Sequence, residues 1–409
     1  MTATNDVIIL GAGPAGLAAA AELKRLGVRD VLVIEREQQA GGVPRHCGHL
    51  GFGWKEFRRV LTGPSYAKRL SHAAAGVEVR TGTTALALEP GGRIRVVSPE
   101  GQETLTGKRI LLALGTRETP RSTRLVSGTR PWGVFTTGAL QQLVYLARIQ
   151  PCRRAVIVGT EFVSFSSLLT MRHAGIKPVA MIESGERILA PAPGAWIARI
   201  AFATRVLTRT QVVAIHGARS VTGIEIERAG ERSIIACDGV VFTGRFVPET
   251  AIVRSSHLAL DAGTGGPVVD QYGRCSDPDF FAAGNLLRPV EPSWTVWSEG
   301  RAVAHAIAAS LHDALPAATR LIPLEAHGPV RYVCPQRAAT PAPLPAALPF
   351  NARVARPANG RLRVLAGKRE LWGQDRRFLP ERRLYLPLDT QHLGSVESLA
   401  VDLAEPARP

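Results

Sequence analysis

The chain has 409 residues, a hydrophobic content of 45% and a formal net charge of +16. This length suffices for two or three domains, and no apolar run is long enough to span a membrane, so we expect no transmembrane segment. The basic residues are mostly arginines spread along the chain, not interleaved with aromatic residues, which argues against nucleic-acid binding. A solvated arginine-rich surface, an acidic partner subunit or anionic cofactors would explain the charge.

Five cysteines are scattered through the sequence, and no two of them form a CxxC pair. An odd number of scattered cysteines is typical of reduced thiols in a reducing compartment. The segment Met1–Asp6 lacks the basic region of a signal peptide, so we expect a cytoplasmic protein. No Ser–His–Asp order, paired carboxylates or metal-ligand spacing stands out, and the sequence predicts neither a hydrolase nor a metal site.

The N-terminal segment combines a strand, a glycine-rich turn, a helix, a second strand and an acid. Its parts are the strand 6–10, the glycines Gly11, Gly13 and Gly16, a helix over 17–26, the strand 31–34 and Glu35. Gly11 allows the tight turn, Gly13 lets the backbone approach a pyrophosphate, and Gly16 lets helix and strand pack closely. The helix N-terminus attracts phosphates, and Glu35 can accept hydrogen bonds from a ribose. The segment therefore predicts a dinucleotide site.

Further strands and helices follow in alternation. We expect a glycine-rich loop over 41–53, a helix over 54–75, strands over 77–80 and 83–88, a hairpin around 90–92 and a buried strand over 108–114. After the second unit described next, we expect strands over 211–216, 221–228, 232–237, 239–243 and 280–283, and an amphipathic helix over 297–311. The Pro/Ala-rich stretch 338–349 indicates a stiff linker, and alternating segments beyond 350 indicate a small β module.

A second dinucleotide-type unit begins at 155–158, continues with a helix over 162–174 and ends with a strand that stops on Glu183. Glu161 occupies the position where the second glycine should admit a pyrophosphate. A carboxylate there would crowd and repel phosphates, which argues against NAD(P) or another adenine nucleotide in this domain and for a structural or repurposed one. Glu183 could serve a ribose, although acids at strand ends are common without a ligand.

The order of these motifs resembles the glutathione-reductase-like flavoproteins, which have two dinucleotide-binding domains. The resemblance covers about 5–315 and is carried by Gly11–Gly16 with Glu35, by a strand ending at Gly115, and by a late motif ending in Gly284 and Asn285. In that family an Asp usually ends the late motif and holds the flavin ribityl chain. An amide can still bond a hydroxyl, so the resemblance implies FAD. The redox-disulfide branch is excluded, because no cysteine pair exists here.

The fold class implied is α/β, with two Rossmann-like dinucleotide-binding domains, the first of them discontinuous because the second is inserted in it, and a small C-terminal β module. The expected boundaries are 1–135 and 250–316 for the FAD-binding domain, 136–249 for the NAD(P)-type domain, 317–349 for a linker and 350–409 for the module.

The loop 41–49 and the runs 57–70, 115–121 and 284–291 sharpen the match. They are similar to the FAD/NAD(P)-type (alpha) subunit of heteromeric flavin dehydrogenases for amino and imino acids, such as hydroxyproline dehydrogenase, opine oxidases and hydrogen cyanide synthase. The resemblance implies an electron-transferring FAD-dependent oxidoreductase subunit in a hetero-oligomer, whose partner flavin subunit oxidises the substrate's C–N bond.

Several relatives carry a cysteine cluster for a [2Fe–2S] centre near the C-terminus. Beyond residue 275 this chain has only Cys334, and one thiolate cannot hold a cluster that needs four ligands. We therefore expect no iron–sulfur cluster in this chain and suspect a small [2Fe–2S] partner subunit. The alternatives are a stand-alone NAD(P)H-dependent flavin reductase passing electrons to ferredoxin or quinone, and a non-enzymatic FAD-binding assembly subunit.

The motifs and the resemblance together imply a set of cofactor-binding residues: Gly11, Gly13, Pro14, Ala15, Gly16, Glu35, Arg36, Gly42, Arg45, Ala85, Gly115, Arg117, Gly284, Asn285 and Trp297. The candidate catalytic residues are Arg45, which could neutralise a phosphate or reduced flavin, and His46 or His49, which could relay a proton. The alternative is a loop whose polar groups satisfy its own backbone. Arg36 could equally be a surface residue, and Trp297 a core residue.

Overall fold

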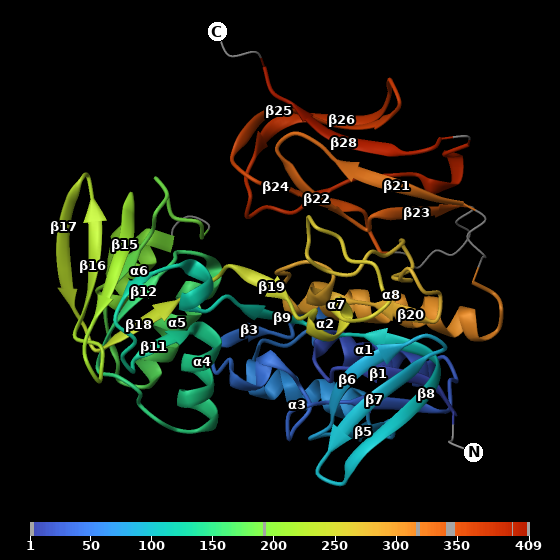
Figure 1. The fold of residues 1–409 in the computed structure, drawn as a ribbon, viewed down its shortest axis with the longest axis horizontal. Helices are drawn as coiled ribbons and strands as arrows, with labels where there is room; N and C mark the ends of the chain where they lie inside the picture. Colours follow the sequence, from blue (N-terminus) through green and yellow to red (C-terminus); the bar gives the residue numbers. More distant parts are fainter. Residues whose placement is uncertain (1–3, 191–193, 316–319, 341–347, 395, 407–409) are drawn as a thin grey trace. The chain divides into compact units, whose positions relative to one another are not determined.

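The structure is a computed structural model that describes residues 4–190, 194–315, 320–340, 348–394 and 396–406. The chain divides into two compact units, each built from separate stretches of sequence. The first unit comprises residues 1–42, 67–116 and 248–409, and the second comprises residues 43–66 and 117–247. Figure 1 traces the chain through both units.

The first unit contains a seven-stranded sheet in the order β5-β2-β1-β8-β7-β6, with β20 also paired to β8. Its strands are β1 (Thr4–Leu10), β2 (Val31–Ile34), β5 (Glu78–Arg80), β6 (Thr84–Glu89), β7 (Arg93–Ser98), β8 (Gly101–Leu112) and β20 (Phe280–Ala282). Strands β5, β2, β1, β8 and β20 are parallel, and β6 and β7 form antiparallel hairpins that extend the sheet. The central strands are continuous apolar runs because residues on both of their faces are buried.

Two helices of this unit pack directly on each other. Helix α1 (Pro14–Arg25) follows the glycine turn, and the long helix α8 (Ser293–Leu311) returns near the C-terminal end of the α/β part. A side chain at Gly300 of α8 would collide with the backbone carbonyl of Ala15, so this glycine permits the close helix crossing. Short elements complete the region: α7 (Ala251–Arg254) and the 3-10 turn η4 (Gly284–Leu286). The expected return of the chain to the first domain at 280–285 is thus observed.

The C-terminal β module belongs to the first unit and consists of two sheets around one apolar core. One sheet has the order β23-β21-β28-β25-β26 and the other the order β22-β24-β27, orange to red in Figure 1. The strands are β21 (Arg320–Ala326), β22 (Val330–Cys334), β23 (Arg337–Thr340), β24 (Asn351–Val354), β25 (Ala358–Ala366), β26 (Arg369–Phe378), β27 (Leu384–Tyr385) and β28 (Leu399–Ala404), with the turn η5 (Thr390–His392).

The structure differs from the expected linker 317–349, because three strands of this module lie inside that interval. Strand β21 pairs in parallel with β28, which lies far along the chain, and antiparallel with β23. These pairings bury Ile322 and Leu324 in the core of the module. Much of the Pro/Ala-rich stretch, residues 341–347, lies outside the described residues.

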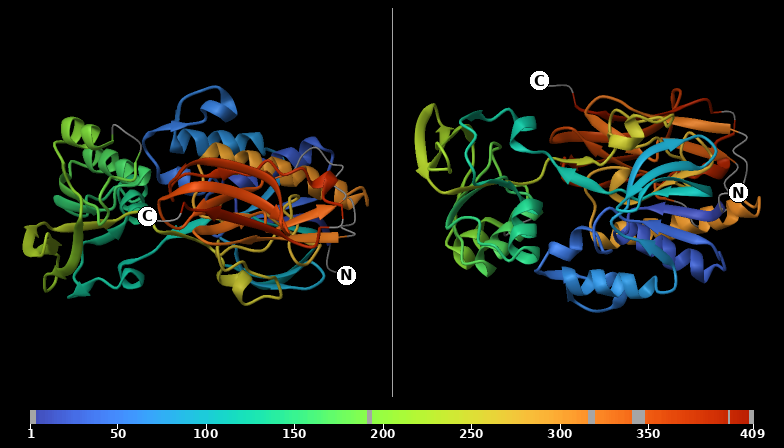
Figure 2. Two further views of the ribbon diagram at one scale, coloured as in Figure 1. Left: turned by 90° about the horizontal axis from the view of Figure 1, so that it is seen from above. Right: turned by 60° about the horizontal axis from the view of Figure 1, so that its bottom comes forward.

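The second unit holds a parallel sheet in the order β11-β18-β12-β13-β14 and a separate sheet in the order β10-β15-β16-β17. In Figure 2 the yellow-green strands of the latter sheet form a layer distinct from the parallel strands. The parallel strands are β11 (Val134–Thr136), β12 (Arg154–Val158), β13 (Lys177–Ile182), β14 (Arg205–Leu207) and β18 (Gly239–Phe242). The others are β10 (Ser127–Gly128), β15 (Thr210–His216), β16 (Gly223–Arg228) and β17 (Glu231–Ala236).

Helices of the second unit are α4 (Thr137–Gln141), continued by the π-helical turn η3 (Gln142–Leu146), α5 (Phe162–His173) and α6 (Gly194–Phe202), besides the turn η2 (Arg121–Arg124). The strands β9 (Thr116–Glu118) and β19 (Phe246–Pro248) pair with each other where the chain passes from one unit to the other. Helix α5 confirms the helix expected over 162–174. Among the described residues, no helix combines the length and apolarity that crossing a membrane requires.

The helix expected over 54–75 is wrong in its first half. After the turn η1 (Val43–His46) and β3 (Leu50–Phe52), this interval contains α2 (Trp54–Phe57), β4 (Leu61–Thr62) and α3 (Gly63–Ala73). Helix α2 stops because Arg58 adopts a left-handed conformation with φ of 55°. The phenolic oxygen of Tyr66 donates a hydrogen bond of 2.8 Å to Glu56, and its ring packs against Phe52 and Phe57, so the segment folds on itself.

Candidate functional site

The glycine turn after β1 has one open position between two closed ones. A side chain at Gly11 would come within 2.5 Å of the Ala113 carbonyl oxygen, and one at Gly16 would overlap the Gly11 carbonyl. A Cβ at Gly13, by contrast, would meet no atom within 4 Å. Gly13 has φ of −81°, which any residue can adopt, so its lack of a side chain leaves space rather than relieving strain. The turn therefore offers bare backbone at Gly13.

Glu35 is fixed at the edge of this turn. One carboxylate oxygen accepts a hydrogen bond of 2.8 Å from the Ala12 N–H, and the other accepts one of 2.9 Å from the Glu37 N–H. The side chain is 7% exposed, and each oxygen retains a further lone pair. Glu35 is therefore oriented by the backbone and can still accept hydrogen bonds from a diol.

Gly41 and Gly42 border the same turn. The backbone of Gly42, with φ of +61°, packs against the Cα of Gly13, and the Gly41 N–H donates a hydrogen bond of 2.8 Å to the Ala12 carbonyl. Gly115, beyond β8, has φ of +74°, and a Cβ there would meet nothing within 4 Å. The resulting cradle matches the chemistry of a pyrophosphate site at Gly13, with no acidic residue in the first turn of α1.

The late motif lies against the same helix. A side chain at Gly284 would come within 2.9 Å of Ala15 Cβ, so the motif contacts the first turn of α1. Asn285 uses its amide to close the following loop: Nδ2 donates to the Glu291 carbonyl at 3.2 Å, and Oδ1 accepts from the Glu291 N–H at 2.7 Å. An aspartate could only accept, so an amide suits this loop better than the acid that the family usually carries. No sequence pattern indicated this loop closure.

The other predicted residues of the first unit are less engaged. Pro14 stands in the first turn of α1, and Ala85 is half-buried in β6. Arg36 is exposed beside Glu37, as a surface residue would be. Trp297 lies under the guanidinium of Arg301, 4.8 Å from its ring centroid, which is a packing contact within α8.

The corresponding turn of the second unit, at Gly159, is filled by the side chain of Glu161. The Oε2 atom of Glu161 accepts hydrogen bonds from Thr243 Oγ1 at 2.8 Å and from Ser164 Oγ at 3.0 Å. A side chain at Gly159 or Gly244 would collide with this carboxylate, so it lies directly over both glycines. Where the first unit is open at Gly13, the second unit places a carboxylate in hydrogen-bonded contact with its own turn.

Glu183 is also engaged within the second unit. Its oxygens accept hydrogen bonds from the Thr160 hydroxyl and, at 2.8 Å, from the Gly185 N–H. Ser164 replaces the third glycine of the pattern, and its hydroxyl lies 2.7 Å from Thr243 Oγ1. The turn therefore carries an internal network of a carboxylate and hydroxyls that occupies the groups a nucleotide would need.

The predicted catalytic residues Arg45, His46 and His49 belong to the second unit, whereas Gly42 belongs to the first. Burial, with the neighbouring Arg45 charge, lowers the pKa of His46 to about 4, so this imidazole is neutral at pH 7. The Nδ1 atom of His49 lies 2.9 Å from the Leu50 carbonyl. Arg45 Nε is buried without a hydrogen-bond partner among the described residues, which makes Arg45 the one of the three best suited to a ligand.

Arg117 is exposed, and the adjacent Glu118 turns to helix α4, where it accepts a hydrogen bond of 2.8 Å from the Gly138 N–H. Burial raises the pKa of Glu118 despite that bond. Glu118 therefore stabilises the start of helix α4 in the second unit.

All five cysteines are unpaired and buried. Burial, with the charge of Glu118, raises the pKa of Cys47 to about 12, and burial also raises the pKa of Cys152 to about 12 and that of Cys237 to about 11. These groups are protonated thiols at neutral pH and therefore poor nucleophiles and metal ligands. Among the described residues, no group of three histidine, cysteine, aspartate or glutamate side chains is placed to hold a metal ion.

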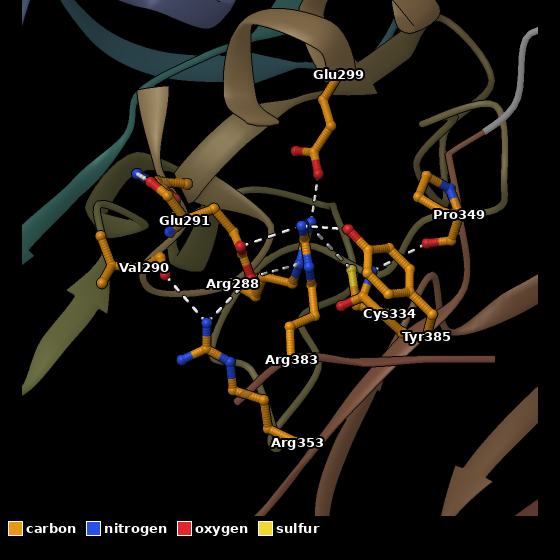
Figure 3. A network of polar contacts seen from close by, with 11 residues as sticks. Arg288, Val290, Glu291, Glu299, Cys334, Pro349, Arg353, Arg383 and Tyr385 are labelled. Carbon is orange, nitrogen blue, oxygen red and sulfur yellow. Dashed lines mark hydrogen bonds and ion pairs between the residues drawn. The ribbon is translucent and has the colours of Figure 1, made fainter. Parts of the chain in front are cut away.

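A buried charge network joins the loop after Asn285 to the C-terminal module, as Figure 3 shows. The guanidinium of Arg288, whose side chain is 2% exposed, pairs with Glu299 of α8 and lies 3.7 Å from Glu291. Arg353 of β24 and Arg383 before β27 each reach a carboxylate oxygen of Glu291 at 3.1 Å. Glu291, whose backbone is hydrogen-bonded to Asn285, is therefore also paired with two arginines of the module.

Comparison with protein families places these features in a known class. A family model described as pyridine nucleotide-disulphide oxidoreductase matches residues 5–309, and the chain belongs to this family. Its fold, with two dinucleotide-binding domains, and its match define an FAD-dependent type of oxidoreductase.

Curated relatives include components of multi-subunit enzymes. The chain is 25% identical over 318 residues to an opine oxidase subunit of Agrobacterium tumefaciens, covering 68% of this chain and 61% of that protein. It is 28% identical over 280 residues to the alpha subunit of sarcosine oxidase from Rhizobium meliloti, covering 64% of this chain and 26% of that protein. A hydrogen cyanide synthase subunit of Pseudomonas protegens is 30% identical over 161 residues, 37% of this chain and 33% of that protein. The chain thus spans less than two thirds of each of these relatives.

Solved structures share the fold. Thioredoxin reductase of T. acidophilum superposes with a TM-score of 0.65 at 23% identity, over 75% of this chain and 98% of that one. L-proline dehydrogenase of P. horikoshii superposes with a TM-score of 0.56 at 19% identity, over 77% of this chain and 59% of that one. These likenesses support the fold class predicted from the sequence.

Proposed function

We propose that this chain is the FAD-binding, electron-transferring subunit of a heteromeric dehydrogenase that oxidises an amino or imino acid. The observation that carries the proposal is the contrast between the two cradles. Gly13 leaves open backbone for a pyrophosphate, whereas Glu161 lies over Gly159 and Gly244 in the second unit. A chain with one open nucleotide cradle must receive electrons from something other than a pyridine nucleotide bound in its second domain.

The residues around the first cradle fit FAD. Gly13 and the N-terminus of α1 would face the pyrophosphate, and Glu35 would accept hydrogen bonds from the adenosine ribose. FAD when bound supplies a ring that accepts electrons and passes them on. The first turn of α8 adjoins the late motif, since a Cβ at Gly284 would lie 3.5 Å from Val296 Cβ. The N-terminus of α8 is the positive end of the helix dipole and would favour negative charge nearby.

The source of electrons is proposed to be a second, FAD-containing subunit that oxidises the C–N bond, with a small [2Fe–2S] subunit in the same complex. Three observations support this assignment. The curated relatives are named subunits of opine oxidase, sarcosine oxidase and hydrogen cyanide synthase. The five cysteines are unpaired, which removes the dithiol route by which disulfide reductases of this fold pass electrons on. The thiols are buried and protonated, which disfavours a cluster in this chain.

The test is reconstitution. The chain is purified alone and together with a candidate flavin-containing subunit and a candidate small [2Fe–2S] protein of the same organism, and dye reduction is measured with hydroxyproline, opines and sarcosine. We expect a yellow chain that is inert alone and active with one of these substrates only in the complex. A chain that reduces the dye with NADH unaided would instead be a stand-alone reductase. A colourless chain that rejects added FAD would overturn the flavin assignment.

A further inference from the structure

Helix α6 (Gly194–Phe202) of the second unit presents an apolar face that the described part of its unit leaves uncovered. Trp196 and Ile200 are each 63% exposed, and Ile197 between them is 36% exposed. The opposite face holds the helix in place: Ala198 is fully buried in the core of the unit, and Phe202 packs against the same core. Single exposed apolar residues are ordinary, but a tryptophan and two isoleucines on one side of one helix form a patch.

The sequence around this helix is basic. Residues 187–224 contain five arginines and no aspartate or glutamate, although the whole chain has 34 acidic residues. Arg199 on α6 and Arg205 at the start of β14 are exposed, and Arg209 is 71% exposed in its ion pair with Glu186. The patch therefore combines an apolar face with an adjoining positive charge.

The same end of the second unit carries a further exposed ring. Phe162, the first residue of α5, is 78% exposed and follows Glu161, whose carboxylate fills the nucleotide cradle. The chain entering α6 is tied to this turn, because the Ala190 N–H donates a hydrogen bond of 2.8 Å to the Thr160 carbonyl. The segment that precedes α6 is therefore anchored to the turn that the Glu161 carboxylate fills.

We propose that α6 is an interfacial helix that binds this chain to an anionic lipid bilayer. Trp196, Ile197 and Ile200 would enter the boundary between headgroups and acyl chains, and Arg199 and Arg205 would contact the anionic headgroups. Tryptophan suits this boundary because its ring is apolar and its N–H is polar. A patch of three residues binds weakly by itself, so the attraction of the surplus positive charge to the lipid is the required second contribution. The inference stands independently of the proposed function.

The test is flotation of the full chain with vesicles at physiological salt. One set of vesicles is pure phosphatidylcholine, and the other mixes phosphatidylcholine with phosphatidylglycerol. We expect binding to the mixed vesicles and about tenfold less binding by the double variant Trp196→Ser, Ile200→Ser, whose net charge is unchanged. The control Trp132→Ser removes a tryptophan that is 81% exposed elsewhere in the same unit and should bind like wild type.

A second measurement distinguishes insertion from charge attraction alone. Brominated phosphatidylcholine mixed with phosphatidylglycerol should quench tryptophan fluorescence of the wild type, and Trp196→Phe should remove most of that quenching while keeping vesicle binding. Equal binding by the double serine variant and the wild type would overturn the proposal, because only the overall charge would then be at work. A wild-type chain that leaves the mixed vesicles unbound would overturn it too, even if the chain co-purifies with an acidic subunit.

Discussion

The carboxylate of Glu161 accepts a hydrogen bond of 2.8 Å from the hydroxyl of Thr243, across the turn where a second nucleotide would be expected. The corresponding position of the first turn is Gly13, where an added Cβ would meet no atom within 4 Å. The two turns follow the same strand–turn–helix pattern with opposite chemistry at this one residue.

Replacing Gly13 with alanine should abolish or strongly weaken FAD binding without harming the fold. The backbone at Gly13 is compatible with any side chain, and the added methyl has open space in the protein, so we expect a stability change within about 0.5 kcal/mol. The methyl would, however, stand where the pyrophosphate approaches. Flavin absorbance and FAD titration measure the first effect, and thermal unfolding measures the second.

The matched variant is Gly16→Ala, whose methyl would overlap the Gly11 carbonyl. We expect this variant to lose at least about 1–3 kcal/mol of stability, because helix and strand must separate. If Gly13→Ala bound FAD as tightly as the wild type, the first cradle would not be the pyrophosphate site.

Replacing Glu161 with glycine should open the second cradle. We expect NADH or NADPH binding to rise from undetectable to measurable by calorimetry, at a cost of about 1 kcal/mol in stability from the lost hydrogen bonds to Thr243 and Ser164. The control Glu161→Gln keeps the bulk of the side chain and removes its charge. Binding by the glutamine variant would show that charge alone closes the site, and an inert glycine variant would show that other groups, such as Ser164, also close it.

Glu22 makes the stability of the first unit depend on pH. Burial raises the pKa of this carboxyl, but hydrogen bonds from Arg25 and Arg301 outweigh burial and lower it from 4.5 to about 2. A lowered pKa in the folded state means that the stabilisation is complete above about pH 4.5 and is lost as the pH falls toward 2. Glu22→Gln should therefore lower stability at pH 7 by about 1–3 kcal/mol, and its difference from wild type should shrink in acid. Urea unfolding across this pH range provides the measurement.

Arg288 should be essential to the junction between α8 and the C-terminal module. Its removal in Arg288→Met would leave Glu299 as a buried charge without its cation, which costs about 3–5 kcal/mol. The double variant Arg288→Met, Glu299→Leu should recover part of this loss. As a control, Arg361→Met breaks the exposed ion pairs with Glu370 and Asp375 on the module and should cost far less than Arg288→Met. Equal losses at Arg288 and Arg361 would refute a special role for the buried network.

The thiols should stay unreactive in the folded protein. Burial raises the pKa of Cys47, Cys152 and Cys334 to about 12, so almost no thiolate is present at pH 8. A disulfide-exchange reagent should label none of the five cysteines until denaturant is added. Fast labelling of two of them in the native chain would reopen the possibility of a redox-active pair.

Local patterns predicted most of the α/β elements, because each depends on residues close in sequence. The turn at Gly11–Gly16, the hairpin at 90–92 and helix α5 are of this kind. The strands in 317–349 were missed because β21 is stabilised by pairing with β28, which lies far along the chain. The break after α2 depends on the single left-handed residue Arg58, which no helical periodicity reveals.

In the candidate site too, the residue types were predictable from local sequence, whereas their distant partners were not. The residue types at Gly13, Glu35 and Glu161 indicated their roles, since each stands at a fixed place in a known turn. The partner of Glu161, Thr243, lies 82 positions away and could be found only in the folded chain. The pairing of Asn285 with the backbone of Glu291 is closer, at six positions, but depends on a loop conformation that the sequence does not specify.

Anaerobic titration of the FAD-loaded wild-type chain with NADH and NADPH tests the central claim most directly. We predict that the flavin absorbance stays that of the oxidised form with either nucleotide in excess, and that it bleaches when the partner flavoprotein and its amino-acid substrate are supplied. Stoichiometric bleaching of the isolated chain by NADH or NADPH would contradict the proposed role.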